Sequence, residues 1–182
     1  MFNLIRALEL VGFESKKEIA AIFGAMVRPE RPDAGSANIV TRTNPVVSYI
    51  AEDPRILKQL IDNYNSQKND VALNSGTILR DCIKNQNLAH IVLHKHYQQF
   101  FDYANLASFD ILSDAFSTFR ELMTRHKPMV KKFLEQHYEA FFKEYNEKLI
   151  KSDNYVTKRQ SIKLISEVLL GTGFNMCDTF SI

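Results

Sequence analysis

The sequence predicts an all-α fold built from helical repeats, and three observations lead to this prediction. Apolar residues recur at intervals of three and four through most of the chain, as they do along one face of a helix. No stretch alternates apolar and polar residues for long enough to indicate a strand. Four helical segments can be aligned with one another, which indicates repeated units rather than unrelated helices.

The predicted helices carry start signals and apolar stripes. Ser15 and Glu18 have the spacing of a capping box, and Ser108 precedes a helix with Asp110 in its first turn. Each of three segments then has an apolar stripe at helical spacing. The stripes are Ile19, Ile22, Phe23 and Met26; Phe109, Leu112, Phe116, Phe119 and Met123; and Leu134, Tyr138, Phe141, Tyr145 and Leu149.

The repeat signal lies in three aligned positions of four helices. Each helix opens on an apolar residue and has a second one eight positions later, with a small residue between them that allows close helix packing. The three sets are Ile19, Val71, Ile111 and Val156; Val27, Leu79, Phe119 and Leu164; and Gly24, Gly76, Ala115 and Ser161. The opening residues lie 52, 40 and 45 positions apart, close to the period of about 40–47 residues in HEAT and armadillo repeats. We therefore favour a right-handed armadillo/HEAT-like solenoid over an irregular helical bundle.

The predicted organisation is a partial repeat array over residues 1–170 and a divergent tail over residues 171–182. A turn-rich segment at about residues 29–44 lengthens the first repeat interval and is predicted to be an inserted loop, and Gly171 is predicted to end the last helix.

Composition excludes several classes of function. The 182 residues contain 45% hydrophobic and 24% charged residues, which is typical of a globular chain with a buried core. A formal net charge of +2 is too small to favour nucleic acid or an anionic membrane surface. No apolar run reaches the roughly 20 residues of a membrane helix, so membrane insertion is not expected. The cysteines Cys82 and Cys177 form no disulfide framework, which favours a reducing, cytoplasmic location.

Catalytic and metal-binding patterns are sparse. His90 and His94 could share a helix face as zinc ligands do, but Ile91 stands where a metalloprotease helix has glutamate, and surface or helix-end histidines are the favoured interpretation. Asp110 and Asp114 lack the surrounding loop of a calcium-binding hand. We therefore expect no enzyme activity, no cofactor, no metal and no small-molecule substrate.

A polar ridge stands out on the last predicted helix. Tyr155, Arg159 and Lys163 recur every four residues and share one face, while Val156, Ile162, Ile165 and Leu169 are expected to point into the stack. Tyr and Arg often dominate the binding energy of protein interfaces. From these residues alone, a protein-binding ridge and a solvated basic face remain equally open.

Several segments resemble the calcium-binding protein 39-like family, also called mouse protein 25 scaffolds. The resemblance runs from about Leu4 to Leu170 and is carried by residues 13–18, 78–83, 108–127, 133–138 and 154–161. It implies an armadillo-like scaffold that binds and activates kinases of the sterile-twenty group, or their pseudokinase adaptor, on its concave face. The family's kinase-facing positions match four residues of this chain: Phe109, Tyr155, Arg159 and Lys163.

The chain also departs from that family. It is shorter, the similarity stops after Leu170, and the later repeats that complete a pocket for a partner's C-terminal aromatic motif are not represented. Two further functions therefore stay open beside the kinase scaffold. One is a general helical-repeat adaptor without a kinase partner, and the other is a truncated product with impaired function.

Overall fold

The structure is a computed structural model that describes residues 1–28 and 44–174 of the chain. Every regular element in these residues is helical, and they contain no strand. The all-α prediction is therefore confirmed. The chain divides into two compact units, residues 1–92 and 93–182, and each unit is described by itself.

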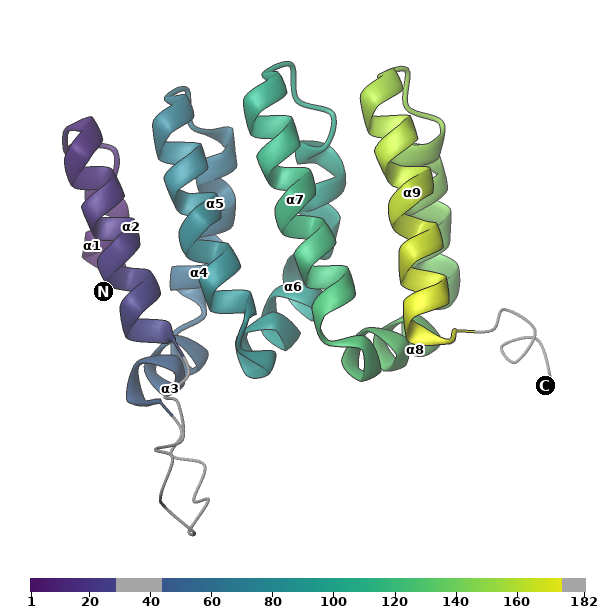
Figure 1. Cartoon of the computed structure of the whole chain (residues 1–182), viewed down its shortest axis with the longest axis horizontal. Coiled ribbons are helices and arrows are strands. Elements are labelled where there is room, and N and C mark those ends of the chain that lie inside the picture. The colour runs from purple at the N-terminus through teal and green to yellow at the C-terminus, as the bar shows by residue number, and fades with distance from the viewer. Residues whose placement is uncertain (29–43, 175–182) are drawn as a thin grey trace, which may run out of the picture. The chain divides into compact units, whose positions relative to one another are not determined.

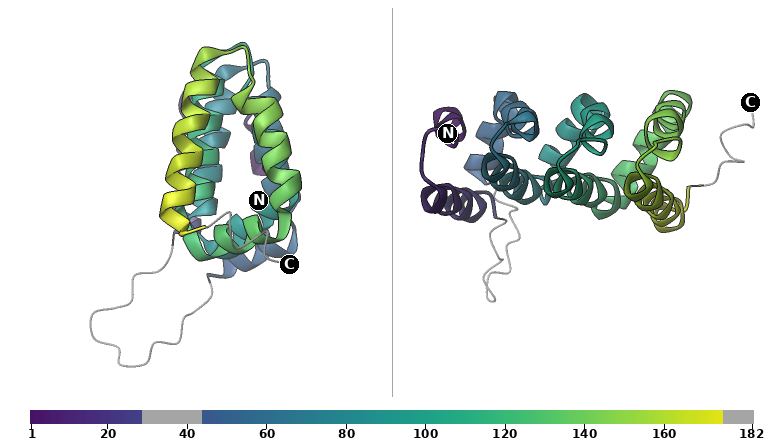
Figure 2. Two further views of the ribbon diagram at one scale, coloured as in Figure 1. Left: turned by 90° about the vertical axis from the view of Figure 1, so that its right-hand side faces the viewer. Right: turned by 90° about the horizontal axis from the view of Figure 1, so that it is seen from above.

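The first unit contains five helices and the beginning of a sixth. They are α1 (Phe2–Ala7), α2 (Phe13–Val27), α3 (Pro45–Glu52), α4 (Arg55–Asp62), α5 (Asn69–Ile83) and α6 (Gln86–Tyr103), with a 3₁₀ turn at Asn63–Asn65 after α4. Within the unit α2 lies beside α5, and α1 packs against α4 (Figure 1). The two helix pairs form two layers, which the view from above separates (Figure 2).

The start of α2 differs from its predicted start. The helix begins at Phe13 with Gly12 as its N-cap, so Ser15 already lies inside the first turn and the predicted capping box is wrong. The predicted stripe is also partly wrong, because Ile22 and Met26 are exposed. The buried face is rotated toward α5 instead, and its members are Lys16, Ala20, Phe23, Gly24 and Val27.

The repeat alignment identifies equivalent positions in α2, α5, α7 (Phe109–Arg125) and α9 (Tyr155–Thr172). The four small residues and the four apolar residues of the second aligned position are all buried. Among the opening residues, Val71 and Ile111 are buried, whereas Ile19 and Val156 are partly exposed. A Cβ atom at Gly24 would collide with the Asp81 carboxylate, so the small residue does permit the close approach of α2 and α5.

The second unit contains the rest of α6, α7, α8 (Lys127–Tyr145), a π turn at Asn146–Ile150, and α9. Helices α7 and α9 lie side by side and run in the same direction, with α8 behind α9 (Figures 1 and 2). Helix α8 bends at His137, whose backbone leaves the helical region (φ −122°, ψ 21°). Aromatic side chains fill the core of this unit: Tyr97, Phe101, Phe119, Phe133, Phe141 and Tyr145.

The predicted loop and tail are only partly described. Of residues 29–44, only Asn44 lies within the described residues, where its side chain accepts the Val46 amide hydrogen bond and caps α3. Helix α9 continues to Thr172, and Gly173 adopts the left-handed conformation (φ +60°) of a helix C-cap. The predicted stop at Gly171 is therefore wrong by two positions. Residues 175–182 of the predicted tail lie outside the described residues.

Candidate protein-binding surface

The ridge on α9 is solvent-exposed. Tyr155 opens the helix with 75% of its surface accessible, and Arg159 and Lys163 follow on the same side at one-turn intervals. Asn154 starts the helix, because its side-chain oxygen accepts hydrogen bonds from the Val156 and Thr157 amides. The predicted common face of the ridge thus exists as a surface.

Buried hydroxyl groups fix the opposite side of α9. The Thr157 hydroxyl donates a hydrogen bond to the Ala104 carbonyl oxygen at 2.6 Å, and the Tyr145 hydroxyl donates to the Ser161 carbonyl oxygen at 2.8 Å. Both hydroxyls lie in the interior of the second unit, where an unmet hydrogen bond is costly. These two contacts set the rotation of α9 about its axis and so direct the ridge outward.

Within the described residues, neither cation of the ridge, Arg159 or Lys163, forms an ion pair with a carboxylate. The nearby Arg120 of α7 does so, since its guanidinium lies 2.7 Å from Glu167 of α9. Arg159 and Lys163 therefore offer hydrogen-bond donors and positive charge to an acidic partner surface.

Phe109 adds an exposed aromatic ring from the neighbouring helix. It is the first residue of α7, and 63% of its surface is accessible. Since α7 and α9 lie side by side and run in the same direction, Phe109 and Tyr155 stand in the first turns of adjacent helices (Figure 1). All four predicted site residues are thus exposed, on the adjacent helices α7 and α9.

Ile162 is an exposed residue that the sequence prediction misplaced. It was expected to point into the stack, but 51% of its surface is accessible. The residues that α9 buries are instead Thr157, Ser161, Leu164 and Val168. Two of these four are hydroxyl-bearing, so a search for apolar residues alone chooses the wrong face. Ile162 therefore gives the exposed surface of α9 an apolar component.

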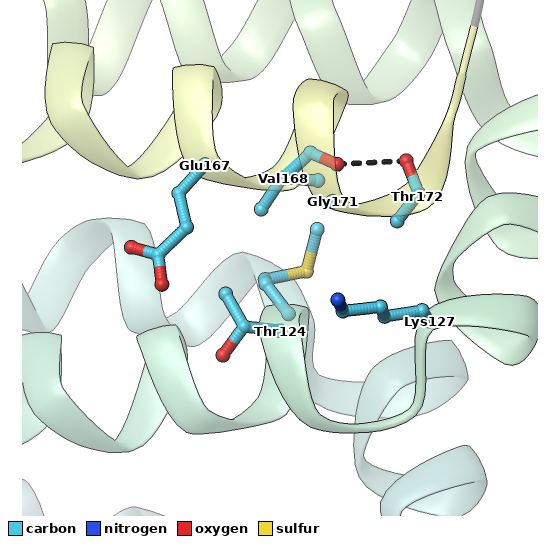
Figure 3. A pocket seen from close by; sticks show the side chains of 7 residues that line it. Thr124, Lys127, Glu167, Val168, Gly171 and Thr172 are labelled. Carbon is cyan, nitrogen blue, oxygen red and sulfur yellow. Dashed lines mark hydrogen bonds between the residues drawn. The ribbon is translucent and has the colours of Figure 1, made fainter.

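A small notch lies at the other end of the same helix pair, between the end of α7, the start of α8 and the end of α9 (Figure 3). Its volume is about 230 Å³. Met123 and Val168 supply apolar side chains, and Lys127 points toward the cavity from the start of α8. The carboxylate of Glu167 at its edge is already paired with Arg120.

In the part of the chain that the structure describes, the histidines and the cysteine considered for metal or thiol chemistry do not have the surroundings of a metal site or a reactive thiol. His90 is exposed, and the His94 ring packs edge-on against Phe133 with centroids 5.1 Å apart. No group of three potential metal ligands occurs in the described residues. Cys82 is fully buried, as expected for a structural thiol, and burial raises the pKa of this thiol far above its usual value. Asp110 lies in the first turn of α7, as predicted.

No helix among the described residues combines the length and the apolar character needed to cross a membrane. The equivalent buried positions of α2, α5, α7 and α9 define the chain as a helical-repeat protein. Comparison with known proteins identifies the family. The chain belongs to the Mo25-like family, whose model matches residues 1–177. This is an armadillo-like helical-repeat family of non-catalytic scaffolds, so the predicted fold class and family are confirmed.

Individual relatives cover nearly the whole chain. It is 44% identical over 171 residues to the human "Calcium-binding protein 39-like", 42% identical to "MO25-like protein 2" of Caenorhabditis elegans, and 40% identical to "Mo25-like protein" of Schizosaccharomyces pombe. These alignments include 92–93% of this chain but only 46–48% of each relative. The chain spans about half the length of the relatives it matches. The predicted boundary at residue 170 remains a prediction, and the family match continues beyond it to residue 177.

Proposed function

We propose that this chain is a non-catalytic scaffold that binds and allosterically activates a protein kinase of the sterile-twenty type, or its pseudokinase adaptor, in the cytoplasm. The binding face would be the outward side of α7 and α9, which the resemblance predicts to be concave. The single observation that supports this proposal most directly is the exposed ridge of Tyr155, Arg159 and Lys163 on α9, whose two cations have no carboxylate partner among the described residues.

The chemistry of the ridge suits a protein partner with acidic groups near its centre. Tyrosine and arginine contribute large amphipathic contact areas, and the exposed Ile162 of the same helix adds an apolar contact. Activation would require one further property. A scaffold raises kinase activity only if it binds the active conformation more tightly than the inactive one. Kinase activity should therefore increase with scaffold concentration and level off when the kinase is saturated.

Charge reversal on the ridge is the first test of the proposal. The double variant Arg159→Glu/Lys163→Glu is expected to weaken binding of a labelled sterile-twenty-type kinase domain by about 2–3 kcal/mol, roughly 30- to 150-fold. Binding would be measured by titration of the labelled kinase, and helix content by circular dichroism. Because both side chains are exposed, the variant should keep the stability of the wild type.

A matched control separates the ridge from general charge. Lys132→Glu/Lys158→Glu makes the same change in net charge at two exposed lysines of α8 and α9 outside the ridge. It should alter the affinity by at most about 1 kcal/mol. An equal loss of affinity for the kinase domain in both double variants would argue against a localised site. A well-folded wild type that binds no kinase of this type would contradict the kinase proposal and favour a general adaptor, whereas a poorly folded wild type would indicate an impaired product.

Truncating Tyr155 tests the aromatic part of the ridge. Tyr155→Ala is expected to weaken kinase binding by about 1–2 kcal/mol with almost no change in the free energy of unfolding, because the side chain is exposed before binding. Affinity and urea unfolding would be measured on the same preparation. Leu170→Ala removes an even more exposed side chain from the same helix outside the ridge, and it should leave both quantities unchanged.

A further inference from the structure

Phe174 is buried although it follows the last helix of the described chain. Only 5% of its surface is accessible. Its ring stacks on Tyr138 with centroids 6.0 Å apart and planes inclined by 22°, and on Phe142 with centroids 6.3 Å apart and planes inclined by 23°. Both contacts are to α8, so the residue after α9 packs back onto the preceding helix.

The surface that receives Phe174 is a pair of rings one turn apart on α8. Tyr138 and Phe142 contact each other with centroids 4.8 Å apart, and both remain partly exposed even with Phe174 in place. Phe141 and Tyr145 of the same part of α8 are instead buried in the core of the unit. The bend at His137 immediately precedes this aromatic pair.

Gly173 provides the turn that brings Phe174 to this surface. It is the only described residue with a positive φ angle, at +60°. A left-handed residue after a helix reverses the chain direction, and an apolar contact commonly accompanies this motif. Leu170, in the last turn of the same helix, is 85% accessible. Burial at the end of α9 is therefore not shared by every apolar residue there.

We propose that Gly173 and Phe174 form an aromatic latch that closes the Tyr138–Phe142 surface of α8 from within the same hairpin. Among the described residues, Phe174 of the same hairpin stacks on both rings of this surface. The latch consists of one turn and two ring contacts, so it can open without unfolding α8 or α9. Its opening uncovers an aromatic surface that is separate from the ridge on α9, and the proposal does not depend on kinase binding.

The absence of tryptophan from the sequence allows a direct test. In Phe174→Trp the single indole should emit at shorter wavelength and be less quenched by acrylamide than the indole of the matched control Leu170→Trp. Adding Tyr138→Ser and Phe142→Ser to Phe174→Trp should move its emission and quenching to those of the control. Identical emission in the two single-tryptophan chains, or no response to the α8 substitutions, would overturn the proposal.

A second pair of variants covers the case in which the serine substitutions disturb folding. Gly173→Val leaves all three rings in place but disfavours the left-handed turn, so it should shift the emission of Phe174→Trp in the same direction. Phe174→Ala alone should increase binding of the dye 8-anilinonaphthalene-1-sulfonate and speed amide hydrogen exchange near residues 138–142, with exchange in α7 unchanged. If exchange rises equally in α7, or dye binding stays at the wild-type level, the latch does not exist.

Discussion

Phe101→Ala is expected to lower the free energy of unfolding by about 3–5 kcal/mol, the range for removing a fully buried aromatic side chain. Phe101 has no accessible surface, and its ring lies within 5.8 Å, centroid to centroid, of four other aromatic rings of the second unit. These rings are Tyr97, Phe119, Phe141 and Tyr145. Because native domains are stable by only about 5–15 kcal/mol, the variant should be close to unfolding at physiological temperature. Urea denaturation followed by circular dichroism would measure the change.

Phe109→Ala is a matched control for this effect, since it makes the same chemical change at an exposed position of the same unit. Its free energy of unfolding should stay within about 0.5 kcal/mol of the wild type. If Phe109 belongs to the binding surface, the control should nevertheless lose affinity for the kinase domain. Comparable stability of the two variants would show that the aromatic cluster is not the core of the second unit.

The sequence was sufficient to predict the all-α class and the equivalent positions of the four aligned helices, because both depend on local periodicity. Gly24, Ala115 and Ser161 could be aligned as small residues, and all three are buried in the structure. Periodicity was less reliable for choosing the buried face. In α2 and α9 this face includes Lys16 and Thr157, which are polar and were therefore not counted as core residues. Their hydrogen-bond partners lie far away in sequence, at Asp70 and Ala104, where a local pattern cannot reveal them.

The ridge was predictable from the sequence as a surface, since residues four apart share a helix face whatever their partner. Its composition was not fully predictable, because the exposure of Ile162 depends on how α9 is rotated against the second unit. The contact of Phe174 with Tyr138 depends on the left-handed turn at Gly173, and a glycine after an apolar helix does not indicate where the following residue will pack.

Asp70→Asn is expected to destabilise the protein by about 3 kcal/mol at neutral pH, because it leaves a buried lysine without its counter-ion. The ammonium group of Lys16 on α2 lies 2.5 Å from the Asp70 carboxylate on α5, and its side chain is only 5% accessible, against 28% for Asp70. Asp110→Asn is the matched control, since Asp110 also lies in the first turn of a helix but is exposed. The control substitution should lower the free energy of unfolding by at most about 1 kcal/mol, the contribution of a first-turn carboxylate to helix stability.

The same ion pair predicts how stability depends on pH. The hydrogen bond from Lys16 is the main cause that lowers the pKa of Asp70 below its usual value of about 3.9. A carboxyl group whose pKa is lower in the folded state contributes stability that is fully present above its unfolded pKa. This contribution is lost as the pH falls through the lower folded pKa. The difference in unfolding free energy between the wild type and Asp70→Asn should therefore be constant from about pH 7 to pH 5 and shrink below about pH 4. Urea unfolding at a series of pH values would measure it.

A paired apolar replacement distinguishes the cost of an unpaired lysine from the worth of the ion pair itself. Lys16→Met/Asp70→Leu removes both charges and keeps apolar volume between α2 and α5, a change that is often neutral for buried pairs. The double variant should regain most of the stability lost in Asp70→Asn and should no longer show the acid-dependent difference. If it is as unstable as Asp70→Asn, the ion pair itself holds the two helices together. If Asp70→Asn costs no more than Asp110→Asn, Lys16 is solvated in solution and α2 does not pack on α5 as described.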